Sequence, residues 1–257
     1  MKNLSLVALN LASACLIATH ANAASFDCNK AATFIEKTIC KNPALSKLDE
    51  AMAKNYKGEL TEAVDFKYGK GYIDSVINEQ RSWLKFQRNT CKESDCLERE
   101  YKERVESKFQ FGRTVLNSNE LSAANIPSAS SFGEFSKTVK ISMYDSETKR
   151  MDQGQETTNT LTIHKVSDKP HLAIIDSVLI FTNAHTCYIG ESKAIWSENH
   201  WVISDDSQGK DAELRLYPVT YQGKTQLLLK DPEGRFRTQN CGMRGYFDGI
   251  VMERELG

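Results

Sequence analysis

One stretch decides the fold of the first half of the chain: TFIEKTICKNPALSKLDEAMAKNYKGEL, residues 33–60. Thr33 followed by Glu36 is a capping-box pattern, which predicts a short helix running through Ile39. Asn42 before Pro43 predicts the N-cap and first turn of a second helix. The second helix presents apolar residues at spacings of three and four, typical of one buried face: Leu45, Leu48, Met52, Tyr56 and Leu60.

Two more helices are predicted after this stretch. Gly69 and Gly71 mark a break in the pattern, so we expect a loop over Thr61–Asp74. The third helix is expected over about 73–90 and the fourth over about 96–110, because apolar residues recur there with helical spacing. We interpret these apolar stripes as a packed core rather than as a cofactor groove.

The fourth predicted helix carries opposite charges four residues apart. Glu98 with Lys102 and Glu100 with Arg104 are spaced to form i,i+4 ion pairs on an exposed helix face. All four side chains are therefore expected in solvent.

The first residues, Met1–Ala23, have the pattern of a cleaved signal peptide. Lys2 precedes an apolar run from Leu4 to Ala18, and Ala21-Asn22-Ala23 is a small-x-small cleavage motif. The alternative is a lipoprotein anchored through Cys15, but apolar residues continue after that cysteine. We therefore expect cleavage after Ala23 and a periplasmic or secreted protein.

Composition excludes several classes of protein. The 257 residues carry 33 Lys and Arg against 34 Asp and Glu, a net charge of −1, which does not favour a basic nucleic-acid binder. A hydrophobic content of 40% excludes a wholly disordered chain. After the leader, the longest apolar run is Leu172–Phe181, which contains Asp176 and is too short to cross a bilayer. No transmembrane segment is expected.

Six cysteines follow the leader, and an even number in an exported chain favours disulfides over metal binding. They are Cys28, Cys40, Cys91, Cys96, Cys187 and Cys241. Six cysteines allow 15 connectivities. A helix that starts at Thr33 leaves the preceding segment free to fold back, so that Cys28 can reach Cys40. Local pairing of Cys91 with Cys96 would close a turn between two helices, and Cys187 with Cys241 would join distant parts of the second half.

The chain divides into two unlike halves. Residues 24–112 have a charged, helical pattern, and 113–135 are rich in Ser and Asn, which indicates a linker. Residues 136–257 are expected to be β-rich, as a small antiparallel barrel or sandwich. The fold class is thus α+β with segregated domains. Seven strands are predicted: 161–164, 172–181, 194–196, 200–204, 213–217, 224–230 and 246–254.

Residues from about 26 to 109 resemble the lysozyme-inhibitor LprI-like N-terminal domain of exported bacterial proteins. The resemblance rests on short segments in a fixed order: Phe26-Asp27-Cys28, Glu36–Cys40, Pro43–Asp49, Gln80–Leu84, Arg88–Cys91 and Cys96-Leu97, with Tyr101 and Arg104. It implies a small helical fold stapled by disulfides, and it implies lysozyme as a partner. The motif residues carried over are Trp83, Leu84, Arg88, Asn89, Leu97, Tyr101 and Arg104.

Most of these motif residues have a structural interpretation. Trp83 is expected in the core, Arg88 and Asn89 at the end of the third helix, and Tyr101 and Arg104 between helices. The segment Thr61–Asp74 is a better candidate for partner contact, because aromatic and basic side chains are favoured at interfaces. Its candidate contact residues are Phe66, Lys67, Tyr68, Lys70 and Tyr72.

The sequence contains no recognisable catalytic or metal-binding motif, so we expect no enzymatic activity, no cofactor and no metal. The sequence lacks Gly-x-Ser-x-Gly, a phosphate loop and His-Glu-x-x-His. His185 near Cys187 could form a dyad only if that cysteine were a free thiol. The acidic residues in Asp205–Asp211 lack the ligand spacing of a calcium loop and indicate a solvated turn.

The function that fits best is an exported binding protein without catalytic activity, which inhibits a lysozyme or another cell-wall hydrolase by occluding its cleft. The alternative is a general envelope interaction protein whose β-rich domain binds another ligand.

Overall fold

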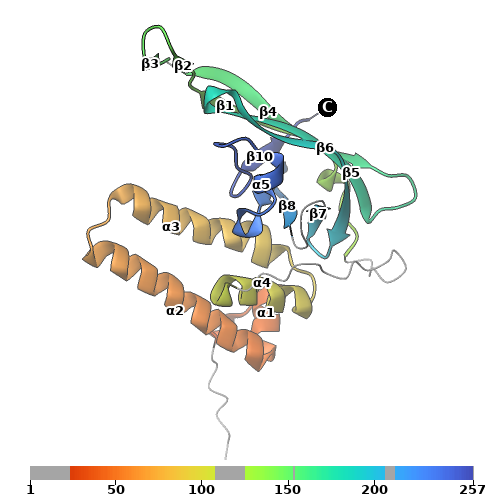
Figure 1. Cartoon of the computed structure of the whole chain (residues 1–257). Coiled ribbons are helices and arrows are strands. Elements are labelled where there is room, and N and C mark those ends of the chain that lie inside the picture. Colours follow the sequence, from red (N-terminus) through yellow and green to blue (C-terminus); the bar gives the residue numbers. More distant parts are fainter. Residues whose placement is uncertain (1–23, 108–124, 153, 206–211, 257) are drawn as a thin grey trace, which may run out of the picture.

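The computed structural model describes residues 24–107, 125–152, 154–205 and 212–256 (Figure 1). A disulfide-linked helical region is followed by a closed antiparallel β-barrel. The predicted leader, residues 113–124 of the predicted linker and most of the turn at Asp205–Asp211 lie outside the described residues.

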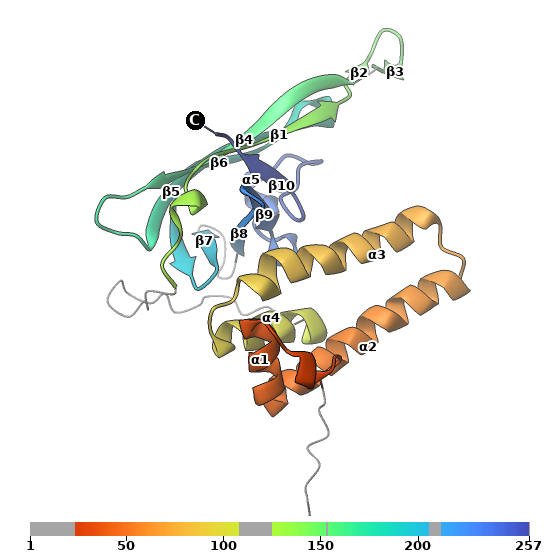
Figure 2. The same cartoon turned by 180° about the vertical axis from the view of Figure 1, so that it is seen from behind.

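The helical region contains four helices, α1 (Phe34–Lys41), α2 (Pro43–Asp65), α3 (Lys70–Ser82) and α4 (Ser94–Glu106). The long helices α2 and α3 form an antiparallel hairpin whose tip lies away from α1 and α4 (Figures 1 and 2). A short 3₁₀ turn, η1 (Cys28–Lys30), precedes α1.

The two helix starts predicted from the sequence are confirmed. Thr33 Oγ1 accepts a hydrogen bond from the Glu36 amide, and Glu36 Oε2 accepts from the Thr33 amide at 2.9 Å. Backbone hydrogen bonds to Thr33 and Ala32 lower the pKa of Glu36. Asn42 Oδ1 caps α2 by accepting from the amide of Ala44 at 2.9 Å.

The predicted third helix has a different form at both ends. It begins at Lys70, and after Ser82 it widens into a π-helical turn, η2 (Trp83–Gln87), and then tightens into a 3₁₀ turn, η3 (Arg88–Thr90). Trp83 packs into the core of the helical region, whereas Phe86 packs against the barrel. The wide π-helical turn thus lets Trp83 and Phe86, only three residues apart, face the helical core and the barrel respectively.

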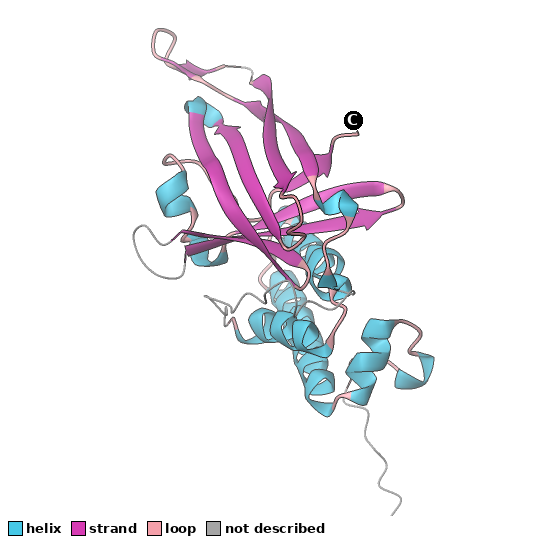
Figure 3. Ribbon diagram, turned by 90° about the vertical axis from the view of Figure 1, so that its right-hand side faces the viewer, coloured by secondary structure: helices cyan, strands magenta, loops and turns pink. Residues whose placement is uncertain are grey.

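The second half is an eight-stranded barrel in the order β1-β10-β9-β8-β7-β6-β5-β4, closed by β1 against β4. The barrel lies on one side of the helical region (Figure 3). Its strands are β1 (Gly133–Ile141), β4 (Gln155–Lys165), β5 (Leu172–Phe181), β6 (His185–Ser197), β7 (His200–Asp205), β8 (Ala212–Tyr221), β9 (Lys224–Lys230) and β10 (Val251–Arg254). A small hairpin, β2 (Tyr144–Asp145) and β3 (Arg150–Met151), extends the β1–β4 connection.

Closure distinguishes this fold from the sandwich that the sequence also allowed. It depends on β1, a strand absent from the seven predicted ones, which pairs with both β10 and β4. β1 starts at Gly133, inside the predicted linker. The sequence pattern of β1 is weak because Lys137 interrupts the alternating apolar positions Phe135, Val139 and Ile141, and of these only Phe135 is fully buried.

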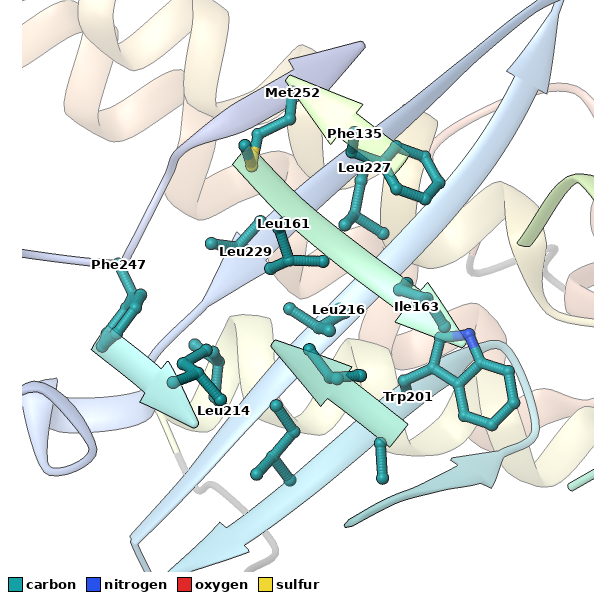
Figure 4. Packing of buried hydrophobic residues seen from close by; sticks show 14 of the residues in the cluster. Phe135, Leu161, Ile163, Trp201, Leu214, Leu216, Leu227, Leu229, Phe247 and Met252 are labelled. Carbon is teal, nitrogen blue, oxygen red and sulfur yellow. The ribbon is translucent and has the colours of Figure 1, made fainter. Parts of the chain in front are cut away.

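Side chains fill the interior of the barrel (Figure 4). Leu161, Leu216 and Leu229 come from three different strands and are fully buried. The ring centres of Trp201 and Trp196 lie 5.0 Å apart in an edge-to-face arrangement. The barrel is therefore a packed core and not a binding cavity of the kind that larger barrels enclose.

All six described cysteines form disulfides, and each pairing considered from the sequence is confirmed: Cys28–Cys40, Cys91–Cys96 and Cys187–Cys241. Their Cα atoms are 5.7, 5.5 and 4.0 Å apart. Such bonds persist in oxidising compartments, which places the protein outside the cytoplasm. Among the described residues, no helix combines the length and apolar character that crossing a membrane would need.

Candidate partner-binding site

The tip of the α2–α3 hairpin exposes a cluster of aromatic side chains. Phe66 is 69% exposed, Tyr68 45% and Tyr72 44%. The Phe66 and Tyr68 rings lie 6.1 Å apart, and those of Tyr68 and Tyr72 lie 4.9 Å apart. Large apolar groups gathered in solvent are typical of an interaction surface. We call these three residues the aromatic tip.

The prediction of a loop over Thr61–Asp74 was wrong in extent. Helix α2 continues to Asp65 and α3 begins at Lys70, so only four residues connect them. Gly69 and Gly71 do not break the helix pattern as expected, because Gly69 is the N-cap of α3 and Gly71 lies within its first turn. Phe66, Lys67 and Tyr68 therefore sit on a short turn between two helices, and Lys70 and Tyr72 lie in the first turn of α3, which holds these residues more firmly than a long loop would.

The charges around the aromatic tip are mixed. Lys67 follows α2 in the left-handed region with φ of +54° and is exposed. Lys70 forms an ion pair with Asp74, and Tyr72 interacts with Glu59, which lies nearly two turns before the end of α2. No ion pair of Lys67 is found in the described part of the chain, so its ammonium group remains available to a partner.

The motif residue Trp83 belongs to the core of the helical region, where it meets Tyr101 edge to face at 5.1 Å. Tyr101 is fully buried, and its hydroxyl donates a hydrogen bond to Asp49 Oδ1 at 2.6 Å. The other oxygen of that carboxylate accepts from the amide and hydroxyl of Ser25. Burial and the charge of Asp49 raise the pKa of Tyr101. Leu97 is fully buried in the same core.

The remaining motif residues lie nearer the surface. Arg88 donates to Asn89 Oδ1 and also interacts with Tyr101. Arg104 bonds to Glu79 and Gln80 and so joins α4 to α3. Leu84 is half-buried at the edge of the helical core. All of these contacts are made within the helical region, and none of these residues lies in the aromatic tip.

A buried ionic contact joins the helical region to the barrel. Arg215 of β8 lies 2.6 Å from Glu103 of α4 and 2.5 Å from Glu213. Burial opposes the charged form of Arg215, but Tyr217 and the two carboxylates outweigh this cost and hold its pKa above the ordinary value. Tyr217, stacked on His200 at 4.4 Å, is fully buried and its pKa is raised by burial and by Glu100.

A second set of contacts surrounds Asn199, in the turn between β6 and β7. Its side-chain oxygen accepts from Arg99 of α4 at 2.9 Å, and its amide nitrogen donates to Thr90 at 2.8 Å. Arg99 also forms ion pairs with Glu198 and Glu100. The helical region and the barrel are thus held together by charged groups that are almost completely buried.

This interface was not predicted from the sequence. It also shows that one expectation about the charged residues of α4 was wrong. Glu98 and Lys102 do pair as predicted. Glu100 does not pair with Arg104 in solvent, because it is 1% exposed and pairs with Arg99. A possible signal was the alternation of charge with Leu and Tyr in β8, whose first six residues are all buried.

The dyad considered for His185 and Cys187 is excluded by bonding, since Cys187 is joined to Cys241. A disulfide sulfur is neither a free nucleophile nor a thiolate ligand. Among the described residues, no group of three or more His, Cys, Asp or Glu side chains could hold a metal ion.

The helical region, with its two disulfides, its buried Trp83–Tyr101 pair and its helical hairpin, matches a known family. Residues 28–108 match the family model of lysozyme inhibitor LprI. We call this matched range the LprI domain; it includes α1 to α4 and ends before the first barrel strand. No curated protein and no solved structure in the comparisons matches the chain. A family of inhibitors agrees with a non-enzymatic role for the LprI domain.

Proposed function

We propose that this protein is an exported, periplasmic or secreted inhibitor of a lysozyme or related cell-wall hydrolase. The observation that carries the proposal is the match of the helical region to the LprI inhibitor family. The aromatic tip supplies the contact surface. Three exposed rings on a short turn and the first turn of α3 can bury apolar area with little loss of conformational freedom, which favours tight binding.

The mode of inhibition that this surface supports is occlusion of the enzyme cleft. Lysozymes cleave glycan between two carboxyl groups. A projecting hairpin can enter a cleft, and the ammonium group of Lys67 can face a carboxylate there while the rings of Phe66 and Tyr68 exclude the sugar. No covalent step is required.

The test is inhibition of purified lysozymes of different types on cell-wall substrate, using the oxidised chain from Ala24 onward. The whole chain is used because separating its halves would expose the buried charges of Glu103 and Arg215. We expect Phe66→Ser combined with Tyr68→Ser to weaken inhibition about 100-fold, as loss of two central aromatic contacts does. Lys67→Asn should weaken it less, and asparagine tolerates the left-handed backbone at that position.

A matched control is available on the barrel. Tyr188 and Tyr221 are 60% and 61% exposed, far from the tip in sequence. Replacing both by Ser removes the same number of exposed rings and should leave inhibition unchanged. Equal inhibition by the tip variant and the parent protein would reject the aromatic tip as the contact surface. Absence of inhibition of every lysozyme type by the parent would reject the proposed function itself.

A further inference from the structure

A groove of about 840 Å³ lies between the LprI domain and the barrel. One wall comes from the end of α3 and the turns that follow it, including Arg81, Leu84 and Lys92. The opposite wall comes from the barrel, including Trp196 and Tyr221. A volume of this size is in the range that small-molecule sites occupy. We call it the interdomain groove.

The charges on the groove are predominantly positive. Arg81 and Lys92 are exposed at its edge, and neither forms an ion pair within the described part of the chain. Lys85 donates to Gln226 Oε1 at 2.5 Å and lies 5.9 Å from the centre of the Tyr221 ring. The single carboxylate on the wall, Glu198, is already paired with Arg99. An anionic ligand therefore meets two free cations and no unpaired carboxylate.

Hydroxyl groups line the groove between these walls. Ser131, Ser128, Ser130 and Thr220 line the groove, and with Thr225 behind them they form a hydrogen-bonded chain with four links of 2.8 to 3.0 Å. Each hydroxyl has one proton, so four links among five hydroxyls leave one O–H free, and every oxygen keeps accepting capacity. The chain thus offers a row of acceptors and one donor.

A buried donor without a partner lies on the barrel wall. Trp196 is 6% exposed, and its indole N–H has no hydrogen-bond acceptor among the described residues. Buried polar groups are almost always satisfied, which makes this donor unusual. Because Trp196 lines the groove, a ligand bound there would lie beside this side chain. Leu84, Pro218 and Val219 provide apolar surface beside these polar groups.

From these observations we infer that the interdomain groove binds a saccharide that carries a carboxylate. Cations at the rim bind the carboxylate, the row of hydroxyls bonds to sugar hydroxyls, and the apolar side chains and the Tyr221 ring cover the C–H faces of the rings. A fatty acid shares the carboxylate, but its alkyl chain has no polar group to use the accepting capacity of the hydroxyl row. This inference does not depend on lysozyme inhibition.

The experiment is calorimetric titration of the oxidised chain from Ala24 with three probes. They are the disaccharide of N-acetylglucosamine and N-acetylmuramic acid, the neutral disaccharide chitobiose, and dodecanoate. We expect the acidic disaccharide to bind about tenfold more tightly than chitobiose, and this preference to fall with added salt. Nitrogen-correlated NMR spectra should show a shift of the Trp196 indole signal, assigned through Trp196→Phe.

Variants locate the site. Arg81→Gln with Lys92→Gln changes only exposed side chains and should remove the preference for the acidic sugar. The matched control, Lys37→Gln with Lys47→Gln, removes two exposed cations elsewhere on the LprI domain and should leave it intact. Equal binding of both sugars, binding of dodecanoate alone, no binding of any probe, or equal effects of the two double variants would each overturn the inference. Lysozyme inhibition measured on the same variants separates its failure from that of the proposed function.

Discussion

Arg215 of β8 and Glu103 of α4 are 112 residues apart in sequence, and their side chains meet at 2.6 Å with exposed fractions of only 2% and 5%. This ion pair connects the barrel to the LprI domain. Around it lie Glu213, Glu100 and Tyr217, all buried. Because charged groups are costly to bury without partners, the two halves of the chain depend on each other's presence.

Removing one member of this pair should destabilise the protein strongly. We expect Arg215→Met to lower the free energy of unfolding by about 3–5 kcal/mol, because Glu103 and Glu213 would remain buried without their cation. Urea unfolding followed by circular dichroism measures the change.

The control for that prediction is an exposed pair on the same helix. Lys102→Met removes the partner of Glu98, whose side chain is in solvent, and should hardly change the unfolding midpoint. If Arg215→Met were as well tolerated as Lys102→Met, the interface drawn between the two halves would be incorrect.

Stability should fall in alkaline solution because of two buried tyrosines. Burial, with Asp49 beside Tyr101 and Glu100 beside Tyr217, raises the pKa of both groups in the folded state. An unfolded tyrosine ionises near pH 10, so above that pH the unfolded chain loses protons that the native state retains. The contribution of these tyrosines to the free energy of unfolding should therefore be constant below about pH 9 and decrease by up to about 1.4 kcal/mol per pH unit for each tyrosine above pH 10.

The variants Tyr101→Phe and Tyr217→Phe test this assignment. Each lacks the ionisable group and should show a shallower decrease between pH 10 and 11.5, although Tyr101→Phe starts from a lower stability because Asp49 loses its donor. Tyr188→Phe alters an exposed tyrosine and should follow the parent curve. Parallel curves for all four proteins would contradict the raised pKa values.

Two glycines should respond to alanine in opposite directions. A Cβ on Gly245 would lie 2.5 Å from Cys187 Sγ and 3.0 Å from Cys241 Cβ, so Gly245→Ala must displace the disulfide or the turn beside it. We expect a loss of about 1–3 kcal/mol, the usual cost of overpacking. Gly58 lies inside α2 with no atom within 4 Å of the new Cβ, and Gly58→Ala should stabilise by about 0.5–1 kcal/mol. A similar shift in thermal midpoint for both variants would refute this prediction.

Thiol counting checks the disulfides directly. The chain from Ala24 should contain no free thiol when it is unfolded without reductant, because all six of its cysteines are paired. Replacing Cys187 and Cys241 by Ala should cost about 4 kcal/mol, and replacing Cys91 and Cys96 about 2 kcal/mol, since the first bond closes the much longer loop. One or more free thiols would reopen the dyad of His185 and Cys187.

Local sequence was sufficient for much of the helical region. Thr33 and Asn42 predicted the starts of α1 and α2 because a capping side chain bonds to amides only two or three residues away. Because the helix starts only at Thr33, the segment before it can fold back along the helix, which made the Cys28–Cys40 disulfide geometrically feasible. Neither inference required any information from the barrel.

Sequence was less informative where the outcome depended on distant groups. The barrel was predicted only as a barrel or a sandwich, because closure depends on β1 reaching both β10 and β4. The residues of the aromatic tip were proposed as contact residues but assigned to a loop, because two glycines that usually interrupt helices lie instead at the N-cap and first turn of α3. The interdomain groove was not predicted at all, since its walls come from segments more than 100 residues apart.

The sequence by itself determined the elements whose physics is local: the capped helices, the apolar stripe of α2, the alternating strands and the cysteines placed to join them. Only the tertiary structure decided which charged residues left solvent. Glu100 and Arg215 have the spacing of ordinary surface residues, and they become buried because side chains of α4 and of the π-helical turn η2 pack against β8. Helical periodicity fixes which residues share a face, but whether that face meets water or another domain is set by packing between segments far apart in the chain.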